Sequence, residues 1–349
     1  MKQFSNVTMR ALRFNPSLLL LFLLFLILVM RTDFDMFLYR PGIITSDETT
    51  YLEGLKSGIE ANFSVILPEP QAGLLSGIVL GSKQVLPEDF KEALVNTSTI
   101  HIVVASGQNL TILSGLIIGF ASIMGRKKAV LVSIFTNLFY AVLTGFQIPI
   151  IRAAFMNIFA SSGMLVGREI SAFYTLLVSA IMMLIYEPLW LFSVSFQLSF
   201  LATFAVMEYA PVVEGRFRFI PDILRQDFVV STSAFLFTLP IIFENFNRVS
   251  VTGIVVNGLV LWTTPIIMAS GGVVAVVSLL SLEVAAALAL FPGVFLTYLI
   301  YIVEFFNSLA PSVEVEPVGW VFWLGYYLLL MGFYAWVKRY IGMDEKEMV

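Results

Sequence analysis

Residues 253–282 read GIVVNGLVLWTTPIIMASGGVVAVVSLLSL, a run of thirty residues without a charged side chain. An α-helix rises 1.5 Å per residue, so roughly 20 apolar residues cross the ~30 Å hydrocarbon core of a bilayer. This run therefore predicts a membrane span. Because Pro265 lies inside it, a broken or re-entrant helix remains an alternative to a single straight helix.

The composition of the whole chain supports the same class. Of its 349 residues 58% are hydrophobic and 13% are charged, and the mean hydropathy is +0.91. Soluble domains average about 25% charged residues, so an ordinary water-soluble protein is excluded. We predict an all-α fold, a polytopic integral membrane bundle of helices.

Apolar blocks divide the chain into about ten predicted transmembrane helices. They cover approximately residues 14–30, 100–123, 129–146, 149–166, 172–186, 189–209, 228–243, 253–282, 284–309 and 318–337. The first block is expected to be a retained signal anchor. The hydrophilic stretch before residue 100 is expected to hold short amphipathic helices on the outer face, one of which lies at the interface or packs on the bundle.

Four segments follow from this count. They are an N-terminal tail with the anchor helix (1–31), an outer segment (32–99), a transmembrane domain (100–337) and a C-terminal tail (338–349). The count places most Lys and Arg residues on one side, which the positive-inside rule makes the cytoplasmic side. We therefore expect a multi-pass protein of the bacterial plasma membrane with both termini in the cytoplasm.

The residue inventory also restricts the chemistry. The chain has no Cys and a single histidine, His101, so it offers no Cys/His zinc cluster and no disulfide. We expect no metal, no cofactor and, without a P-loop, no ATP-driven motor in this chain. The formal net charge of −4 provides no overall attraction for nucleic acid.

Polar residues inside the apolar blocks carry the functional information, because each costs free energy in hydrocarbon unless it faces another helix or water. Five clusters stand out: His101 with Ser106, Gly107, Gln108 and Asn109; Thr144 and Gly145 with Arg152; Pro188 with Gln197 and Ser199; Thr238 with Pro240; and Ser250 with Asn257 and Pro265. In the first cluster Gly107 weakens a helix by up to about 1 kcal/mol, so we expect the helix to break there.

In this order the clusters resemble the transmembrane competence domain of the ComEC family, the inner-membrane DNA-uptake channel proteins of bacteria. The family's histidine followed by Ser-Gly-x-Asn resembles residues 101–109, and its Thr-Gly and Arg-Ala stretch resembles residues 144–153. Its Phe-Gln-Leu-Ser motif is similar to residues 196–199, and its Asn-x7-Pro segment to residues 257–265. The resemblance covers roughly residues 71–309.

Two positions depart from the family pattern. Ser195 stands where the family has glycine, and Asn109 stands where many relatives have a second histidine, so a two-histidine role is not available. Complete members also carry a soluble oligonucleotide-binding-like domain and a metallo-β-lactamase-like domain. Neither is expected in this chain, so the resemblance is to the channel alone.

The resemblance implies a channel for the uptake of single-stranded DNA during natural transformation. It implies that a separate nuclease and a cytoplasmic helicase-like motor act with the chain, which would also contact membrane lipid; a homodimer is compatible with the sequence. We expect these residues to line the DNA path: His101, Ser106, Gly107, Gln108, Asn109, Thr144, Gly145, Arg152, Gln197, Ser199, Asn257 and Pro265.

Each of these residues has a purely structural alternative. Intramembrane amides and hydroxyls also join helices by hydrogen bonds. Arg152 suits phosphate groups through its planar fork, yet it could instead snorkel to the outer interface or cap the carbonyls of a broken helix. Ser106 is not a convincing nucleophile, because His101 is five residues before it and no acid in the motif orients that histidine, so no catalytic residue is expected.

Two other functions remain open. A secondary transporter for a small solute would use the same broken helices, with Glu304 as its proton or ion-pair site about five residues inside its span. The third alternative is a noncatalytic scaffold subunit of a split DNA-uptake system.

Overall fold

The computed structural model describes residues 50–82, 86–103, 106–167, 171–217, 221–246, 248–250, 252–309, 313–316 and 318–347. Within these ranges the chain is almost entirely helical, and the predicted all-α class is confirmed. One small exception is the antiparallel pairing of β1 (Arg248–Val249) with β2 (Val313–Glu314). The predicted anchor helix over 14–30 lies outside the described residues.

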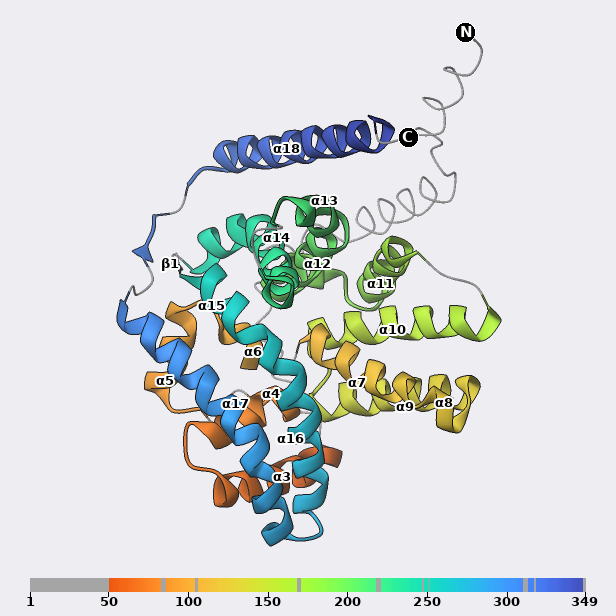
Figure 1. The fold of residues 1–349 in the computed structure, drawn as a ribbon, viewed down its shortest axis with the longest axis vertical. Coiled ribbons are helices and arrows are strands. Elements are labelled where there is room, and N and C mark those ends of the chain that lie inside the picture. The colour runs from red at the N-terminus through yellow and green to blue at the C-terminus, as the bar shows by residue number, and fades with distance from the viewer. Residues whose placement is uncertain are drawn as a thin grey trace.

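The lower body in Figure 1 is built on two long helices, α16 (Thr264–Ser278) and α17 (Leu282–Leu309), which pack along each other. Three helices from the N-terminal third cover them: α3 (Thr50–Ile66), α4 (Gln71–Leu80) and α5 (Glu88–Asn96). Sequence reasoning did not predict α3. The shared core contains fully buried side chains such as Phe63, Leu74, Ile78, Ile267 and Leu296.

Helix α4 lies inside this body. Every residue from Ala72 to Leu80 is buried, because α3, α16 and α17 all contact the helix. The sequence was compatible with a helix at the membrane interface or one packed on the bundle, and in the structure α4 packs within the bundle. Helix α5 begins at Glu88, directly after Pro87, as the proline and the acidic first turn predict.

A second group of helices projects to one side of the body: α7 (Gly107–Gly119), the short α8 (Ala121–Met124), α9 (Arg126–Leu143) and α10 (Ile148–Val166). Helices α7, α9 and α10 contact one another. Before them α6 (Ile100–Val103) lies near the centre of the molecule and contacts α4 and α5 (Figure 1). The predicted span over 100–123 is therefore three helical segments, because the chain restarts its helix at Ser106 and interrupts it again after Gly119.

The third group starts with α11 (Ala172–Tyr186) and a 3-10 turn, Pro188–Phe192. Then α12 (Val194–Phe204) continues through a π-helical turn, Ala205–Tyr209, into α13 (Ala210–Glu214). Helix α14 (Asp222–Phe246) packs against α12 and α15 (Gly253–Val260). A 3-10 turn, Leu261–Thr263, joins α15 to α16, so the apolar run 253–282 is helical as far as Ser278, with one irregular turn just before Pro265.

The last helix, α18 (Trp320–Glu347), crosses one end of the molecule and is anchored to α14 by side-chain hydrogen bonds (Figure 1). Pro240 inside α14 has no N–H group to donate to the carbonyl of Leu236, and the Tyr326 hydroxyl donates to that carbonyl oxygen at 2.9 Å. The Tyr327 hydroxyl donates to the carbonyl of Phe237 at 2.8 Å. Helix α18 therefore compensates for the proline in α14.

Five helical stretches are long and apolar enough to cross a membrane: Ile148–Leu165, Val194–Glu214, Arg225–Phe246, Gly253–Ser278 and Leu282–Leu309. Three shorter apolar helices are Gln71–Leu80, Ala172–Tyr186 and Val321–Val337. These helices support a multi-pass membrane protein, whereas the predicted count of about ten spans is not confirmed. Helix α7 has 13 residues, and three basic residues occupy the first turn of α9, so neither helix has the full apolar length of a span.

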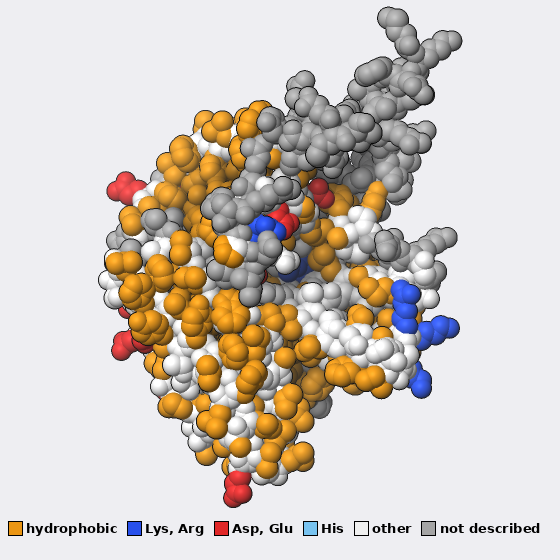
Figure 2. Space-filling model, in the orientation of Figure 1, with side chains coloured by type: hydrophobic (Ala, Val, Ile, Leu, Met, Phe, Trp, Pro, Cys, Tyr) orange, Lys and Arg blue, Asp and Glu red, His pale blue; other side chains and the backbone are white. Residues whose placement is uncertain are grey.

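The surface has the composition that lipid contact requires. Hydrophobic side chains cover most of the face shown in Figure 2. Large apolar side chains are strongly exposed on several helices, including Val276 (63%), Leu290 (73%) and Leu329 (76%). Such a surface would aggregate in water and is stable in hydrocarbon.

Candidate functional site

The predicted helix break at Ser106 is present and is held in place from two sides. Ser106 has extended backbone angles (φ −111°, ψ 160°) and caps α7, because its Oγ accepts a hydrogen bond from the backbone N–H of Asn109. The Ser106 hydroxyl also donates to Oδ1 of Asn109 at 3.0 Å. Nδ2 of Asn109, which is 1% exposed, donates to the carbonyl of Ile78 in α4 at 3.0 Å.

The turn between α9 and α10 is joined to the same end of α4. Gly145 adopts φ +73°, which favours glycine, and Thr144 closes α9 by donating from Oγ1 to the Tyr140 carbonyl at 2.9 Å. Nε2 of Gln147 donates to the carbonyl of Gly81 at 3.3 Å. The helix break and this turn are therefore both attached to the C-terminal end of α4.

Arg152 lies in the first part of α10 and is 9% exposed. Its Nη1 donates to the carbonyl oxygen of Ser199 and to Oγ1 of Thr203, both on α12. Its Nε has no hydrogen-bond partner, and neither has the buried Oγ of Ser199. The ion pairs of the described residues join Lys91 to Glu88 and Arg225 to Glu214, so Arg152 has no carboxylate partner among them.

Gly107 brings the first turn of α7 against this guanidinium. A Cβ atom added at Gly107 would overlap Nη2 of Arg152 and lie 3.2 Å from Cβ of Ala153. Three of the predicted site residues therefore meet, Gly107 from α7, Arg152 from α10 and Ser199 from α12. We call Gly107, Arg152, Ser199 and Thr203 the arginine cluster.

The other predicted residues lie outside this cluster. Nε2 of Gln197 donates to the carbonyl of Leu191 at 3.0 Å, across the 3-10 turn that precedes α12. Asn257 is 8% exposed on α15, and its Oδ1 has no partner. Pro265 occupies the first turn of α16, where its missing N–H group leaves no bond unmade. In the described ranges no hydrogen bond links these residues to Arg152.

His101 and Gln108 are exposed, on α6 and in the first turn of α7 respectively. Asn109 and Arg152 each donate a hydrogen bond to another helix, which is the joining role that the sequence left open, whereas Gln197 bonds to the turn just before its own helix. Their role in lining a path remains a prediction.

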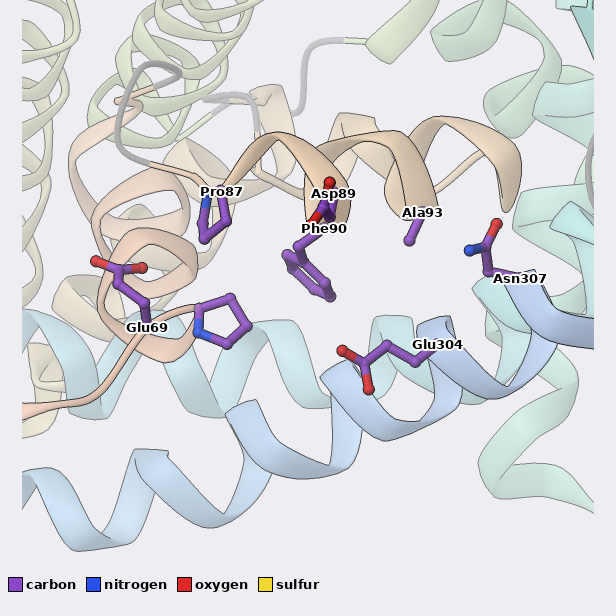
Figure 3. A pocket seen from close by; sticks show the side chains of 8 residues that line it. Glu69, Pro87, Asp89, Phe90, Ala93, Glu304 and Asn307 are labelled. Carbon is purple, nitrogen blue, oxygen red and sulfur yellow. The ribbon is translucent and has the colours of Figure 1, made fainter.

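Glu304 belongs to a different region. It is exposed on α17 and lines a pocket of about 370 Å³ with Glu69, Asp89 and Asn307 (Figure 3). In Figure 3 the Glu304 and Asn307 side chains extend from α17 towards Phe90 and Ala93 of α5. This pocket and the arginine cluster have no residue in common.

Sequence reasoning missed a polar network that joins α7, α9 and α10. The Ser114 hydroxyl donates to Oδ1 of Asn137 at 2.7 Å, and Nδ2 of Asn157 donates to the Ser114 hydroxyl at 3.3 Å. Two signals could have found it. All three are polar residues in apolar blocks, and Ser114 is seven residues after Gly107, which places both on one face of α7. Thr203, four residues after Ser199 on α12, was missed as well.

These features define a class: an α-helical multi-pass membrane protein in which a capped helix break meets a buried arginine that has no carboxylate partner in the described ranges. Comparison with known proteins agrees with the predicted resemblance. A family model described as Competence protein matches residues 78–340, and the chain belongs to that family. The matched range contains every predicted site residue.

One curated relative is a Bacillus subtilis (strain 168) protein named ComE operon protein 3. The two sequences are 26% identical over 302 residues, which is 80% of this chain and 37% of the relative. The chain therefore spans well under half of the relative's length. No solved structure matches the chain.

Proposed function

We propose that this chain forms a channel that carries single-stranded DNA across the bacterial plasma membrane during natural transformation. The observation that carries the proposal is the match of the competence family to residues 78–340, which include the membrane-spanning helices and the arginine cluster. The apolar surface and the long apolar helices agree with a protein embedded in the membrane.

The path that we propose passes the capped break at the start of α7 and the arginine cluster. Non-helical backbone is tolerated at membrane depth where protein covers it or where it lines a water-filled cavity. Gln108, exposed beside the break, and the buried guanidinium behind Gly107 supply polar groups there. The lining role of His101, Thr144, Gln197, Asn257 and Pro265 rests on their positions in the family motifs.

The proposal includes an orientation. Three exposed basic residues, Arg126, Lys127 and Lys128, begin α9, and Figure 2 shows a group of Lys and Arg side chains at the right edge of the molecule, with a few others near the centre. The positive-inside rule assigns such a cluster to the cytoplasm. The anchor segment (1–31) and the C-terminal tail (338–349) would then begin and end in the cytoplasm, with residues 32–99 on the outer side of the transmembrane domain (100–337).

The same family resemblance supports the proposed partners. Single-stranded DNA is the transported polymer, a separate nuclease would supply the strand and a helicase-like motor would draw it into the cytoplasm. We propose no catalytic role for this chain. A homodimer is a further proposal, which cross-linking in the membrane would test.

A deletion strain tests the channel. We expect loss of the gene to abolish transformation while DNA still binds to the cell surface, because binding precedes passage through the inner membrane. Complementation with the wild-type gene should restore uptake. Normal transformation in the deletion strain would reject the channel and the scaffold alike.

A solute transporter is the second candidate, and the pocket around Glu304 is the observation that favours it. Three carboxylates, Glu69, Asp89 and Glu304, line one pocket, which would suit a cationic solute or a proton site. Proton-coupled uptake of a defined solute by reconstituted proteoliposomes, lost in Glu304→Gln, would support this candidate over the channel.

A further inference from the structure

Two sources of positive charge lie next to each other in the arginine cluster. A helix N-terminus carries the equivalent of roughly half a positive charge, and α7 begins at Gly107, in contact distance of the Arg152 guanidinium. Arg152 itself carries a full charge and is 9% exposed. Because no carboxylate of the described residues pairs with Arg152, this positive charge is not compensated within them.

Hydrogen-bond donors at the cluster also lack acceptors. Nε of Arg152 is buried without a partner among the described residues, and the hydrogen bonds from Arg152 to α12 use Nη1. Ser106 caps the N–H group of Asn109, and no acceptor among the described residues bonds to the N–H groups of Gly107 and Gln108. The Ser199 hydroxyl, 8% exposed, has no partner either. Buried donors of this kind cost free energy unless an acceptor reaches them.

We propose that this cluster binds one phosphodiester group of the passing DNA strand. The Arg152 guanidinium, which lies against Gly107, and the N–H groups of Gly107 and Gln108 would donate to oxygens of the same phosphate. Helix N-termini and arginine forks are the two protein groups best suited to phosphate. The inference rests on the proposed function, because that function supplies the strand.

The surroundings favour a strand over a lipid headgroup. Gln108 and Thr111 are exposed on α7 and Ser106 is half-buried, so polar side chains flank the approach to the cluster. A phospholipid would need apolar surface for its acyl chains directly beside its phosphate. A nucleotide polymer needs polar or neutral neighbours that do not depend on its sequence, and amides and hydroxyls meet that need.

Gly107 has a specific part in this site. Any side chain there would meet Nη2 of Arg152 and Cβ of Ala153, and would displace the guanidinium from the first turn of α7. Glycine therefore lets the arginine approach the helix N-terminus closely enough for one phosphate to contact both. A substitution at Gly107 therefore tests the site without removing the charge of Arg152.

Binding of a short fluorescent oligothymidine to the full chain in dodecyl maltoside, a phosphate-free detergent, tests the site. We compare the phosphodiester probe with the same oligomer carrying uncharged methylphosphonate linkages. We expect Arg152→Gln and Gly107→Ala to weaken binding of the phosphodiester probe about tenfold. Arg152→Gln should also reduce the slope of log affinity against log salt by about 0.7, as the loss of one phosphate contact to a single strand predicts.

The matched control is Arg126→Gln, which removes an exposed arginine at the start of α9. It should leave the affinity nearly unchanged, and Arg152→Gln should not affect the methylphosphonate probe. Equal affinity of folded Arg152→Gln and wild type for the phosphodiester probe would overturn the inference. If that variant does not fold, equal affinity of the wild-type chain for the two probes would overturn it as well.

A second experiment with added phospholipid distinguishes a lipid headgroup from the DNA strand as the source of the phosphate. Added phosphatidylglycerol could stabilise the wild-type chain but not the Arg152 variant, while oligonucleotide binding does not depend on Arg152. That result would show that the cluster binds a lipid headgroup and not the DNA strand. None of these results changes the outcome that the proposed function predicts for the deletion strain. A chain that is required for transformation but binds DNA independently of Arg152 would keep the proposed function and lose this site.

Discussion

Nη1 of Arg152 donates a hydrogen bond to the carbonyl oxygen of Ser199, and this bond joins α10 to α12 inside the bundle. The two residues are 47 positions apart in the sequence, and the acceptor is a backbone atom, so any residue type at 199 could supply it. A carbonyl oxygen has no formal charge, so this bond leaves the positive charge of Arg152 uncompensated, whereas a carboxylate partner would balance it. The bond therefore positions the guanidinium without neutralising it.

Arg152→Ala should lower transformation by at least about tenfold while the protein remains in the membrane, because the change removes the charge from the proposed path. Arg152→Lys should give an intermediate value, since lysine keeps the charge and loses the fork. Transformation frequency, with an immunoblot of the membrane fraction, measures both. Wild-type frequencies in Arg152→Ala would remove Arg152 from the path.

Tyr326→Phe should destabilise the protein by about 1 kcal/mol, because the Leu236 carbonyl loses the donor that replaces the missing N–H of Pro240. In a Pro240→Ala background the same change should cost much less, since the alanine N–H can bond to Leu236. Tyr327→Phe is the comparison, because the Phe237 carbonyl, unlike that of Leu236, is followed four residues later in α14 by a residue with an N–H group, Ile241. Thermal unfolding in detergent measures this double-mutant cycle, and additive effects would contradict the account.

Gly145→Ala should destabilise the turn before α10 by roughly 1–2 kcal/mol, the cost of a left-handed backbone for a residue with Cβ. Space is not the reason, because a Cβ at Gly145 would meet nothing within 4 Å. Gly115→Ala in the middle of α7 is the matched control, with equally open space. That change should stabilise the helix by up to about 1 kcal/mol, so the two melting temperatures should move in opposite directions.

Asn109→Ala should destabilise the protein by about 1 kcal/mol, because it leaves the Ile78 carbonyl and the Ser106 hydroxyl without their Asn109 partner. Gln108→Ala, one residue away and exposed, should leave the melting temperature almost unchanged. If the two changes had equal effects on stability, the buried bond to α4 would not matter for folding.

Glu304→Gln distinguishes the two candidate functions. The channel proposal expects normal transformation, because the pocket of Glu304 shares no residue with the arginine cluster. The transporter proposal expects loss of proton-coupled solute uptake. A large fall in transformation with Glu304→Gln would show that the DNA path reaches this pocket or that the protein is misassembled, and membrane abundance would separate these outcomes.

The membrane class, the family and the position of the helix break could be predicted from the sequence. Apolar length is a local property, and so is the weak helix propensity at Gly107 beside the capping hydroxyl of Ser106. The turn at Gly145 followed from the same kind of local chemistry. The span count was less predictable, because basic residues at the start of α9 and the short length of α7 leave these helices without a clear hydrophobic boundary.

Which polar residues meet could not be predicted in this way. The sequence treats Gly107, Arg152, Gln197 and Asn257 alike, as polar or helix-weakening residues in apolar surroundings, and local patterns do not say which helices become neighbours. Packing of α7, α10 and α12 brings Gly107 and Arg152 to Ser199 and leaves Asn257 on α15, apart from them. The sequence alone thus determined that an arginine lies within an apolar block, because the block's length is a local property. Only the tertiary structure decided that the charge is buried and that its neighbour is a helix N-terminus rather than a carboxylate of the described residues.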